Sequence, residues 1–138
     1  MADFVETAAD STGRNGTIAA IGRVLIAAIF VWSGYGKLTN QEYVLGYISS
    51  FGLPAPTLAL WGAIFVELVG GLALAVGFKT RIVAIFMAVY SIVAAFIFHT
   101  DFADPNQMIH FFKNLAMTGG LLQLVAFGAG PLALDRGR

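Results

Sequence analysis

Four long apolar stretches occupy most of this 138-residue chain and constrain its fold more than any other feature. They cover residues 18–35, 58–78, 82–98 and 111–132, approximately. A bilayer core about 30 Å thick needs on the order of 20 apolar residues per helix, and each stretch comes close to that length. Charged residues make up only 12% of the chain, where a soluble domain has roughly 25%. We therefore predict an all-α integral membrane protein, a four-helix bundle of transmembrane spans.

The rest of the chain divides around these spans. Residues 1–17 are predicted to form a soluble tail, 18–134 the membrane domain and 135–138 a C-terminal tail. Apolar residues between spans one and two recur with a helical period at 43, 44, 47, 48 and 51, which predicts a short amphipathic helix over about 41–51, lying on the outer membrane face. Lysines and arginines gather on the side that holds both termini, which predicts cytoplasmic termini.

Composition also excludes several classes of function. The formal net charge is zero and the chain has no Gly-rich phosphate loop, so we expect no nucleic-acid partner. Cysteine is absent, which removes disulfides and dithiol redox chemistry carried by this chain. A redox function would therefore depend on a cofactor that is bound or that belongs to a partner.

Ionised residues inside the apolar stretches are the main functional signal, because such residues normally face the bundle interior and find a partner. Arg23 and Lys37 share one face of span one, and Glu67 lies beside small residues on span two. From helix rise we expect Glu67 to pair with Arg23, leaving Lys37 and Lys113 as cations at the outer mouth. Either these charges only fix helix registry, or they form a ligand or proton site with Glu67 as its reactive group. The candidate ligand-binding residues are Arg23, Lys37, Tyr90, Lys113 and Asn114.

A second polar group lies in the loop between spans three and four. It consists of His99, Asp101, Asp104 and His110. The spacing lacks the i, i+4 histidine geometry of strong metal motifs, so we predict a solvated loop and no metal site, with the histidines as candidate proton carriers. Phe30 and Phe127 fall on the predicted inward faces. An aromatic pocket beside cations would suit a flat, carbonyl-bearing molecule such as a quinone.

Several sequence blocks together resemble the DoxX family of small bacterial inner-membrane proteins, over about residues 18–134. The blocks are Arg23 with Ser33-Gly34-Tyr35-Gly36-Lys37, then Gly52-Leu53-Pro54-Ala55-Pro56, then Glu67 with Gly70-Gly71, Gly77 and Thr80-Arg81, and finally Lys113-Asn114-Leu115. The resemblance implies a four-helix protein of the bacterial inner membrane. It also implies relatives that serve as a subunit of a thiosulfate:quinone oxidoreductase or as the membrane member of an oxidoreductase complex for oxidative stress.

Two functional hypotheses remain open at this stage. The first is an oxidoreductase, or the membrane subunit of one, that binds a quinone or another small hydrophobic ligand between its helices. The second is a non-catalytic membrane scaffold for a soluble or peripheral partner enzyme, or a small-solute carrier. An exposed face of small residues would also permit a homodimer.

Overall fold

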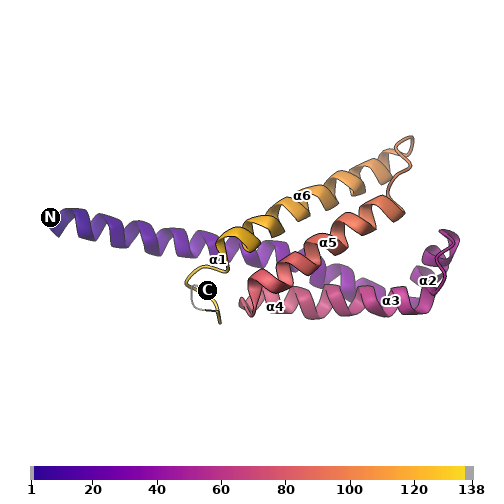
Figure 1. Ribbon diagram of the computed structural model, residues 1–138, viewed down its shortest axis with the longest axis horizontal. Helices are drawn as coiled ribbons and strands as arrows, with labels where there is room; N and C mark the ends of the chain where they lie inside the picture. The colour runs from indigo at the N-terminus through magenta and orange to yellow at the C-terminus, as the bar shows by residue number, and fades with distance from the viewer. Residues whose placement is uncertain (1, 136–138) are drawn as a thin grey trace.

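The computed structural model describes residues 2–135 of the chain, with side chains from Gly13 onward. This part of the chain is helical and contains no strand. The elements are α1 (Ala2–Thr39), α2 (Gln41–Ser50), α3 (Pro56–Phe65), the π-helical turn η1 (Val66–Gly70), α4 (Gly71–Val76), α5 (Thr80–Phe98) and α6 (Pro105–Phe127). Figure 1 shows that α3, η1 and α4 follow one another as a single rod beside α1, whose N-terminal part extends beyond the other helices.

Three helical segments in the described part of the chain are long and apolar enough to cross a membrane. They are Gly13–Thr39 in α1, Pro56–Val76 across α3, η1 and α4, and Thr80–Phe98 in α5. These correspond to the first three predicted spans. The amphipathic helix predicted at about 41–51 is confirmed as α2. Residues 2–17 of the predicted tail are helical and continuous with the first span, because α1 begins at Ala2.

The helices associate as two antiparallel hairpins. One pairs α1 with the α3–η1–α4 rod, and the other pairs α5 with α6 along their length (Figure 1). Close approaches at two glycines join the hairpins. A Cβ atom at Gly70 would lie 2.9 Å from the sulfur of Met87, and one at Gly120 would lie 2.6 Å from Cδ1 of Ile26. The apolar core lies at this seam and consists of Ala27, Phe30, Leu74, Ala84, Met87, Ala88, Leu121 and Leu124.

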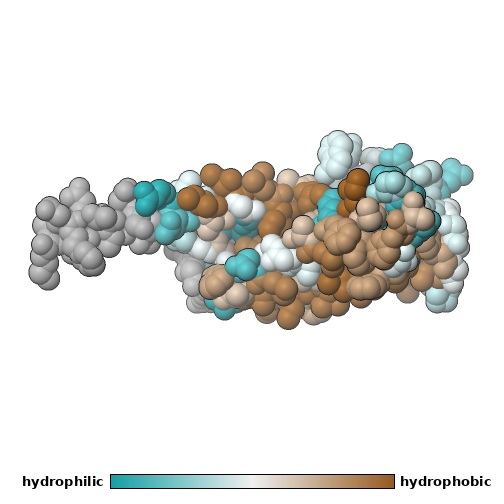
Figure 2. All heavy atoms as spheres, turned by 90° about the horizontal axis from the view of Figure 1, so that it is seen from above, coloured by the Kyte–Doolittle hydropathy of each residue, from teal (hydrophilic) through white to brown (hydrophobic). Residues whose placement is uncertain are grey.

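The two ends of the molecule are formed by different segments. We call the end with α2 and the α5–α6 turn the loop end, and the end with the α4–α5 turn and residues 128–135 the terminal end. Figure 2 shows a hydrophobic surface along the middle of the helices and a gathering of polar residues at the loop end. Large apolar side chains such as Leu25, Phe65 and Phe86 are exposed on α1, α3 and α5. A surface of this kind is suited to contact with lipid.

The fourth apolar stretch departs from its predicted boundaries. The helix α6 begins at Pro105, with Asp104 accepting a hydrogen bond from the backbone N–H of Asn106 at 2.9 Å as its N-cap. It ends at Phe127, whereas the predicted span continued to Leu132. Gly128 follows with a φ of 77°, a conformation that favours glycine, and turns the chain back across the terminal end.

The residues after α6 form a strap, residues 128–135, that closes the terminal end. Its backbone N–H groups at Leu134 and Asp135 donate to the carbonyl oxygens of Val76 and Gly77 at 3.0 and 2.9 Å. The Asp135 carboxylate accepts hydrogen bonds from the backbone N–H groups of Lys79 and Thr80 at 2.7 and 2.8 Å, where α5 begins. A carboxylate at this position also complements the positive end of the α5 dipole. The strap thus joins α4, α5 and α6.

The turn between α4 and α5 depends on Gly77. This residue has a φ of 71°, and its N–H and that of Phe78 donate to Leu74 and Ala73, the paired bonds of a Schellman motif. A Cβ atom at Gly77 would collide with the side chain of Ala133 in the strap. Only glycine satisfies both requirements.

We therefore predict that Gly77→Ala destabilises the protein by about 2 kcal/mol or more, because it combines left-handed strain with a collision against the strap. Gly62→Ala is the matched control, since a Cβ atom at this exposed position in α3 meets nothing within 4 Å. Alanine there should be neutral or slightly stabilising. Thermal unfolding of the detergent-solubilised variants measures both effects, and equal midpoints for the two would contradict the role of the strap.

Candidate functional site

Glu67 is the centre of the candidate site. Its side chain is 7% exposed, and it lies in the π-helical turn between α3 and α4. Lys37, near the end of α1, places its Nζ atom 3.0 Å from Oε1 and 3.0 Å from Oε2 of this carboxylate. Ser33 completes the group, because its hydroxyl donates to Oε1 at 3.0 Å and accepts from Lys37 at 2.9 Å. A carboxylate this deeply buried requires such a partner.

The backbone around Glu67 is built for a close approach of α1. A Cβ atom at Gly34 would lie 2.8 Å from Cγ of Leu68 and 3.0 Å from Cβ of Glu67. Gly71 permits the same kind of approach further along the rod, where a Cβ atom would lie 2.8 Å from Val31. The π-turn, Val66–Gly70, adds a residue to this stretch of helix and changes the direction of the side chains. Such turns are rare and frequently occur at functional sites.

Tyr90 brings the second hairpin to the same carboxylate. It lies on α5, and its hydroxyl interacts with the Glu67 side chain. The Oε2 atom of Glu67 nevertheless remains buried without a well-formed hydrogen bond, although the Lys37 ammonium is close to it. The site therefore contains a cation, two hydroxyl groups and an acceptor oxygen with unused capacity, at the seam between the two hairpins.

The predicted ion pair between Glu67 and Arg23 is wrong. Arg23 is buried at the terminal end, where its guanidinium donates to the carbonyl oxygens of Ala129 and Leu132 in the strap and of Ala75 in α4. The argument from helix rise compared only the positions of Arg23 and Glu67 along their own helices and did not consider other acceptors for the guanidinium. The strap supplies carbonyl oxygens to Arg23, and Lys37 takes its place beside Glu67.

The two predicted ligand-binding residues on α6 lie apart from Glu67. Asn114 is buried against α5 and donates from Nδ2 to the carbonyl oxygen of Ser91 at 3.4 Å. Lys113 is exposed, and its Nζ lies 3.0 Å from Nδ1 of His110. The buried face of α6 consists of Phe111, Asn114, Thr118, Leu121 and Leu124 and does not include Lys113. Tyr90 and Lys37 alone among the predicted ligand-binding residues contact Glu67 in the described part of the chain.

The loop histidines come together, but the acidic residues do not join them in a metal site. The ring centroids of His99 and His110 are 5.2 Å apart. Among the described residues, no group of three or more histidines, cysteines and carboxylates could hold a metal ion. Asp104 instead caps α6, and the backbone N–H of Asp101 donates to Gln107.

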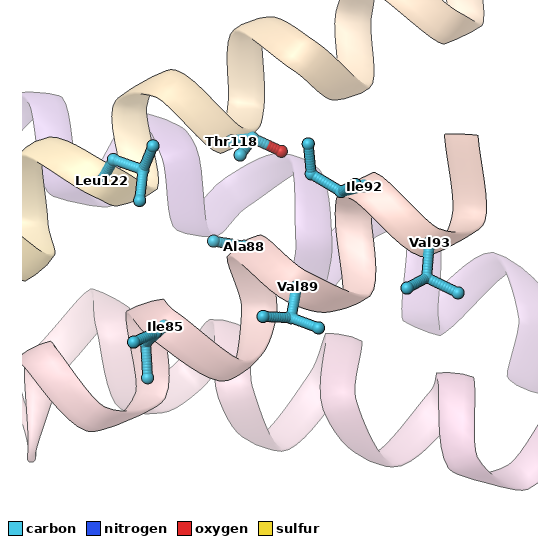
Figure 3. A pocket seen from close by; sticks show the side chains of 7 residues that line it. All are labelled: Ile85, Ala88, Val89, Ile92, Val93, Thr118 and Leu122. Atoms are coloured by element: carbon cyan, nitrogen blue, oxygen red, sulfur yellow. The ribbon is translucent and has the colours of Figure 1, made fainter. Parts of the chain in front are cut away.

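The predicted aromatic pocket is only partly present. Phe30 is buried in the core, whereas Phe127 is exposed at the end of α6. An open groove of about 300 Å³ lies between α5 and α6 instead and has almost entirely apolar walls (Figure 3). It is lined by Ile85, Ala88, Val89, Ile92, Val93, Thr118 and Leu122. Its shape and apolar walls are suited to a hydrocarbon chain.

Sequence reasoning missed two features of the site. Ser33 was noted only as part of a sequence block, although it lies one helical turn before Lys37 and therefore shares its face. The four-residue spacing of Ser33 and Lys37 could therefore have indicated that Ser33 belongs to the site. The π-turn at Glu67 had no signal of its own, because its residues are compatible with an ordinary α-helix.

We predict that Lys37→Met destabilises the protein by about 3 kcal/mol, because it leaves the Glu67 carboxylate buried without a cation. Adding Glu67→Gln to this variant should restore most of the loss, since the remaining amide carries no charge. A double-mutant cycle on thermal or denaturant unfolding in detergent measures the coupling. Strictly additive effects would contradict a direct ion pair.

The fold and the site define a polytopic helical membrane protein with a buried ion pair at the seam of two hairpins. The family model named DoxX matches residues 18–100, and the chain belongs to this family. It is 37% identical to the inner membrane protein YqjF of Escherichia coli K12 over 84% of this chain and 88% of that protein. It is 33% identical to the inner membrane protein YphA of the same organism, over 84% of this chain and 86% of YphA. No solved structure matches the chain significantly.

Proposed function

We propose that this protein is the membrane subunit of a quinone-linked oxidoreductase and that the quinone head group binds beside Glu67, Lys37 and Tyr90. The observation that carries the proposal is the buried Oε2 atom of Glu67, which lacks a well-formed hydrogen bond while a cation and a tyrosine hydroxyl lie beside it. Ionisable residues inside membrane helices commonly mark ligand or proton sites. Glu67 can accept a hydrogen bond from a quinol, and the two donors can bind quinone carbonyls.

The chemistry assigns a proton-handling role to this chain. Reduction of a quinone takes up two electrons and two protons. The chain has no cysteine, so the electrons would come from a redox cofactor that this chain binds or that a partner subunit carries. Its own contribution is to hold the head group, to stabilise negative charge on the quinone oxygens through Lys37, and to exchange protons through Glu67. The apolar groove between α5 and α6 offers a surface for a hydrocarbon tail.

The same proposal places the chain in a bacterial inner membrane, where its two named relatives are inner membrane proteins. It also makes α6 the fourth span. This helix has 23 residues, which corresponds to about 35 Å and is enough for a bilayer core. Its polar first turns would lie at the headgroup level with α2. Both termini would then face the cytoplasm, in keeping with the distribution of lysines and arginines.

The test is a binding titration of the purified protein in nanodiscs with a short-tailed ubiquinone and a short-tailed menaquinone analogue. We expect saturable binding that Glu67→Gln and Tyr90→Phe each weaken by about tenfold, the effect of losing one hydrogen bond to a buried partner. Asn106→Ala, at the exposed beginning of α6, is a control that should bind like the parent protein.

Two outcomes would count against the proposal. Binding that is absent for both analogues would remove the quinone site, and binding that is unchanged in the Glu67 and Tyr90 variants would place it elsewhere. In the first case, co-purification of a stoichiometric soluble enzyme from native membranes would support the scaffold alternative.

A further inference from the structure

The loop end holds a pair of histidine side chains that the proposed quinone site does not use. His99 follows α5 and His110 lies in the first part of α6, so each arm of the α5–α6 hairpin contributes one ring. The ring centroids are 5.2 Å apart, within the range of packed aromatic pairs. The Lys113 ammonium lies 3.0 Å from Nδ1 of His110. Two groups that become cations in acid thus lie beside a group that already is one.

The hydrogen bond from Lys113 requires a neutral His110. An ammonium can only donate, so Nδ1 of His110 accepts with its lone pair and the ring carries its proton on Nε2. A protonated imidazole has an N–H group on both nitrogens and no lone pair to offer. Protonation of His110 therefore breaks this bond and brings two positive groups together. The acid that acts on His110 is Asp104, whose Oδ1 atom already caps α6 by accepting from Asn106.

His99 is also held in a setting that suits the neutral ring. Its Nδ1 atom is buried and has no hydrogen-bond partner among the residues that the structure describes. In a neutral ring this atom can be the unprotonated nitrogen, an acceptor that is merely unused. In a protonated ring it becomes a buried N–H group without an acceptor, which is costly. Burial accordingly lowers the pKa of His99, and the positive charges on His110 and Lys113 from α6 and on Lys37 from α1 lower it further.

The residue before His99 anchors the end of α5 against α2. The ring centroid of Phe98 lies 5.9 Å from that of Tyr47 and 5.0 Å from that of Phe51. Phe98 also packs against the apolar cluster that joins α2 to α3, which consists of Ile48, Leu60 and Ile64. Tyr47 is the titratable group of α2 at this contact, and burial raises its pKa above the usual value, so it stays neutral where histidines titrate. A movement of the end of α5 therefore changes the packing of α2.

We infer that the contact between His99 and His110 is an acid-sensitive latch, which keeps the loop end closed at neutral pH and releases the end of α5 and α2 when the rings become protonated. The direction follows from the two pKa values. Burial first and neighbouring cations second lower both in the closed arrangement, whereas a ring released into water has the ordinary value of 6.5. The closed arrangement is therefore fully stable above pH 6.5 and loses stability as the pH falls below it. The latch goes beyond the proposed function, because no quinone takes part in it.

Hydrogen–deuterium exchange of the full chain in nanodiscs measures the opening, after correction for the intrinsic pH dependence of exchange. Between about pH 7.5 and about pH 5, we expect amide protection at residues 98–104 and in α2 to fall on the order of tenfold, as like charges at this separation near a protein surface predict. The strap at the terminal end contains no histidine and should keep its protection. Thr100→Ala, an exposed change in the same turn, is the matched control and should respond like the parent protein.

Magnetic resonance of isotope-labelled histidine observes the latch directly, because the chain has only 2 histidines. We expect both rings to titrate below 6.5, with His110 carrying its proton on Nε2 at neutral pH. Replacing both residues, His99→Gln with His110→Gln, should abolish the acid response of the exchange. Lys113→Gln keeps a donor beside Nδ1 but removes the charge, so it should raise the pKa of His110 and weaken the acid response.

Three results would overturn the latch. They are protection of the loop end that does not change in acid, an acid response that persists in the double histidine variant, and histidine rings that titrate at or above 6.5 in the folded protein. The Lys113 variant guards against a structural explanation, since it leaves both rings in place. A Lys113→Gln protein whose acid response equals that of the parent would show that the neighbouring charge plays no part.

Discussion

A carboxylate buried in an apolar membrane protein is the constraint on which this structure depends. Glu67 loses its hydration inside the bundle, and only a nearby cation and hydrogen-bond donors offset that loss. Lys37 and Ser33 supply them from α1, so α1 must stay helical to Thr39 and approach η1 closely. The absence of a side chain at Gly34 permits that approach. The register of α1 against η1, the length of α1 and the glycine at position 34 thus all serve to pair one buried charge.

Arg23, a buried cation in the middle of α1, attaches this helix to the terminal end of the bundle. Arg23 and Lys37 lie on one face, separated by about 21 Å along the axis at 1.5 Å per residue. Lys37 attaches α1 to η1, and Arg23 attaches it to the strap and to α4 through carbonyl oxygens. The α5–α6 hairpin joins this unit through apolar contacts, such as Met87 against Gly70, and through the polar bonds of the strap and of Tyr90. The site lies where the two hairpins meet.

The sequence was sufficient for the parts of the fold that follow a simple period. The buried faces of α1 and α5, and the position of α2, follow from apolar and small residues at helical spacing. Lys113 was expected to face the interior like other ionised residues in apolar stretches, but it is exposed, because a lysine near a helix end can place its ammonium in water. Gly128, Gly130 and Pro131 indicate that α6 ends before residue 132, but the high hydropathy of this stretch favoured a longer helix. The partner of Glu67 was predicted wrongly because helix rise does not show which α1 cation has other acceptors, as Arg23 has in the strap.

The geometry of the pair bears on whether it serves only to fix helix registry. A registry contact needs Lys37, Ser33 and one oxygen of Glu67, all of which belong to a single hairpin. It does not need the π-turn, nor a tyrosine from the other hairpin beside the same carboxylate. Nor does it use Oε2 for a well-formed hydrogen bond, although the Lys37 ammonium lies 3.0 Å from this second oxygen. These features go beyond what a registry contact needs, and they are the ones that a ligand or a transferred proton at Glu67 would use.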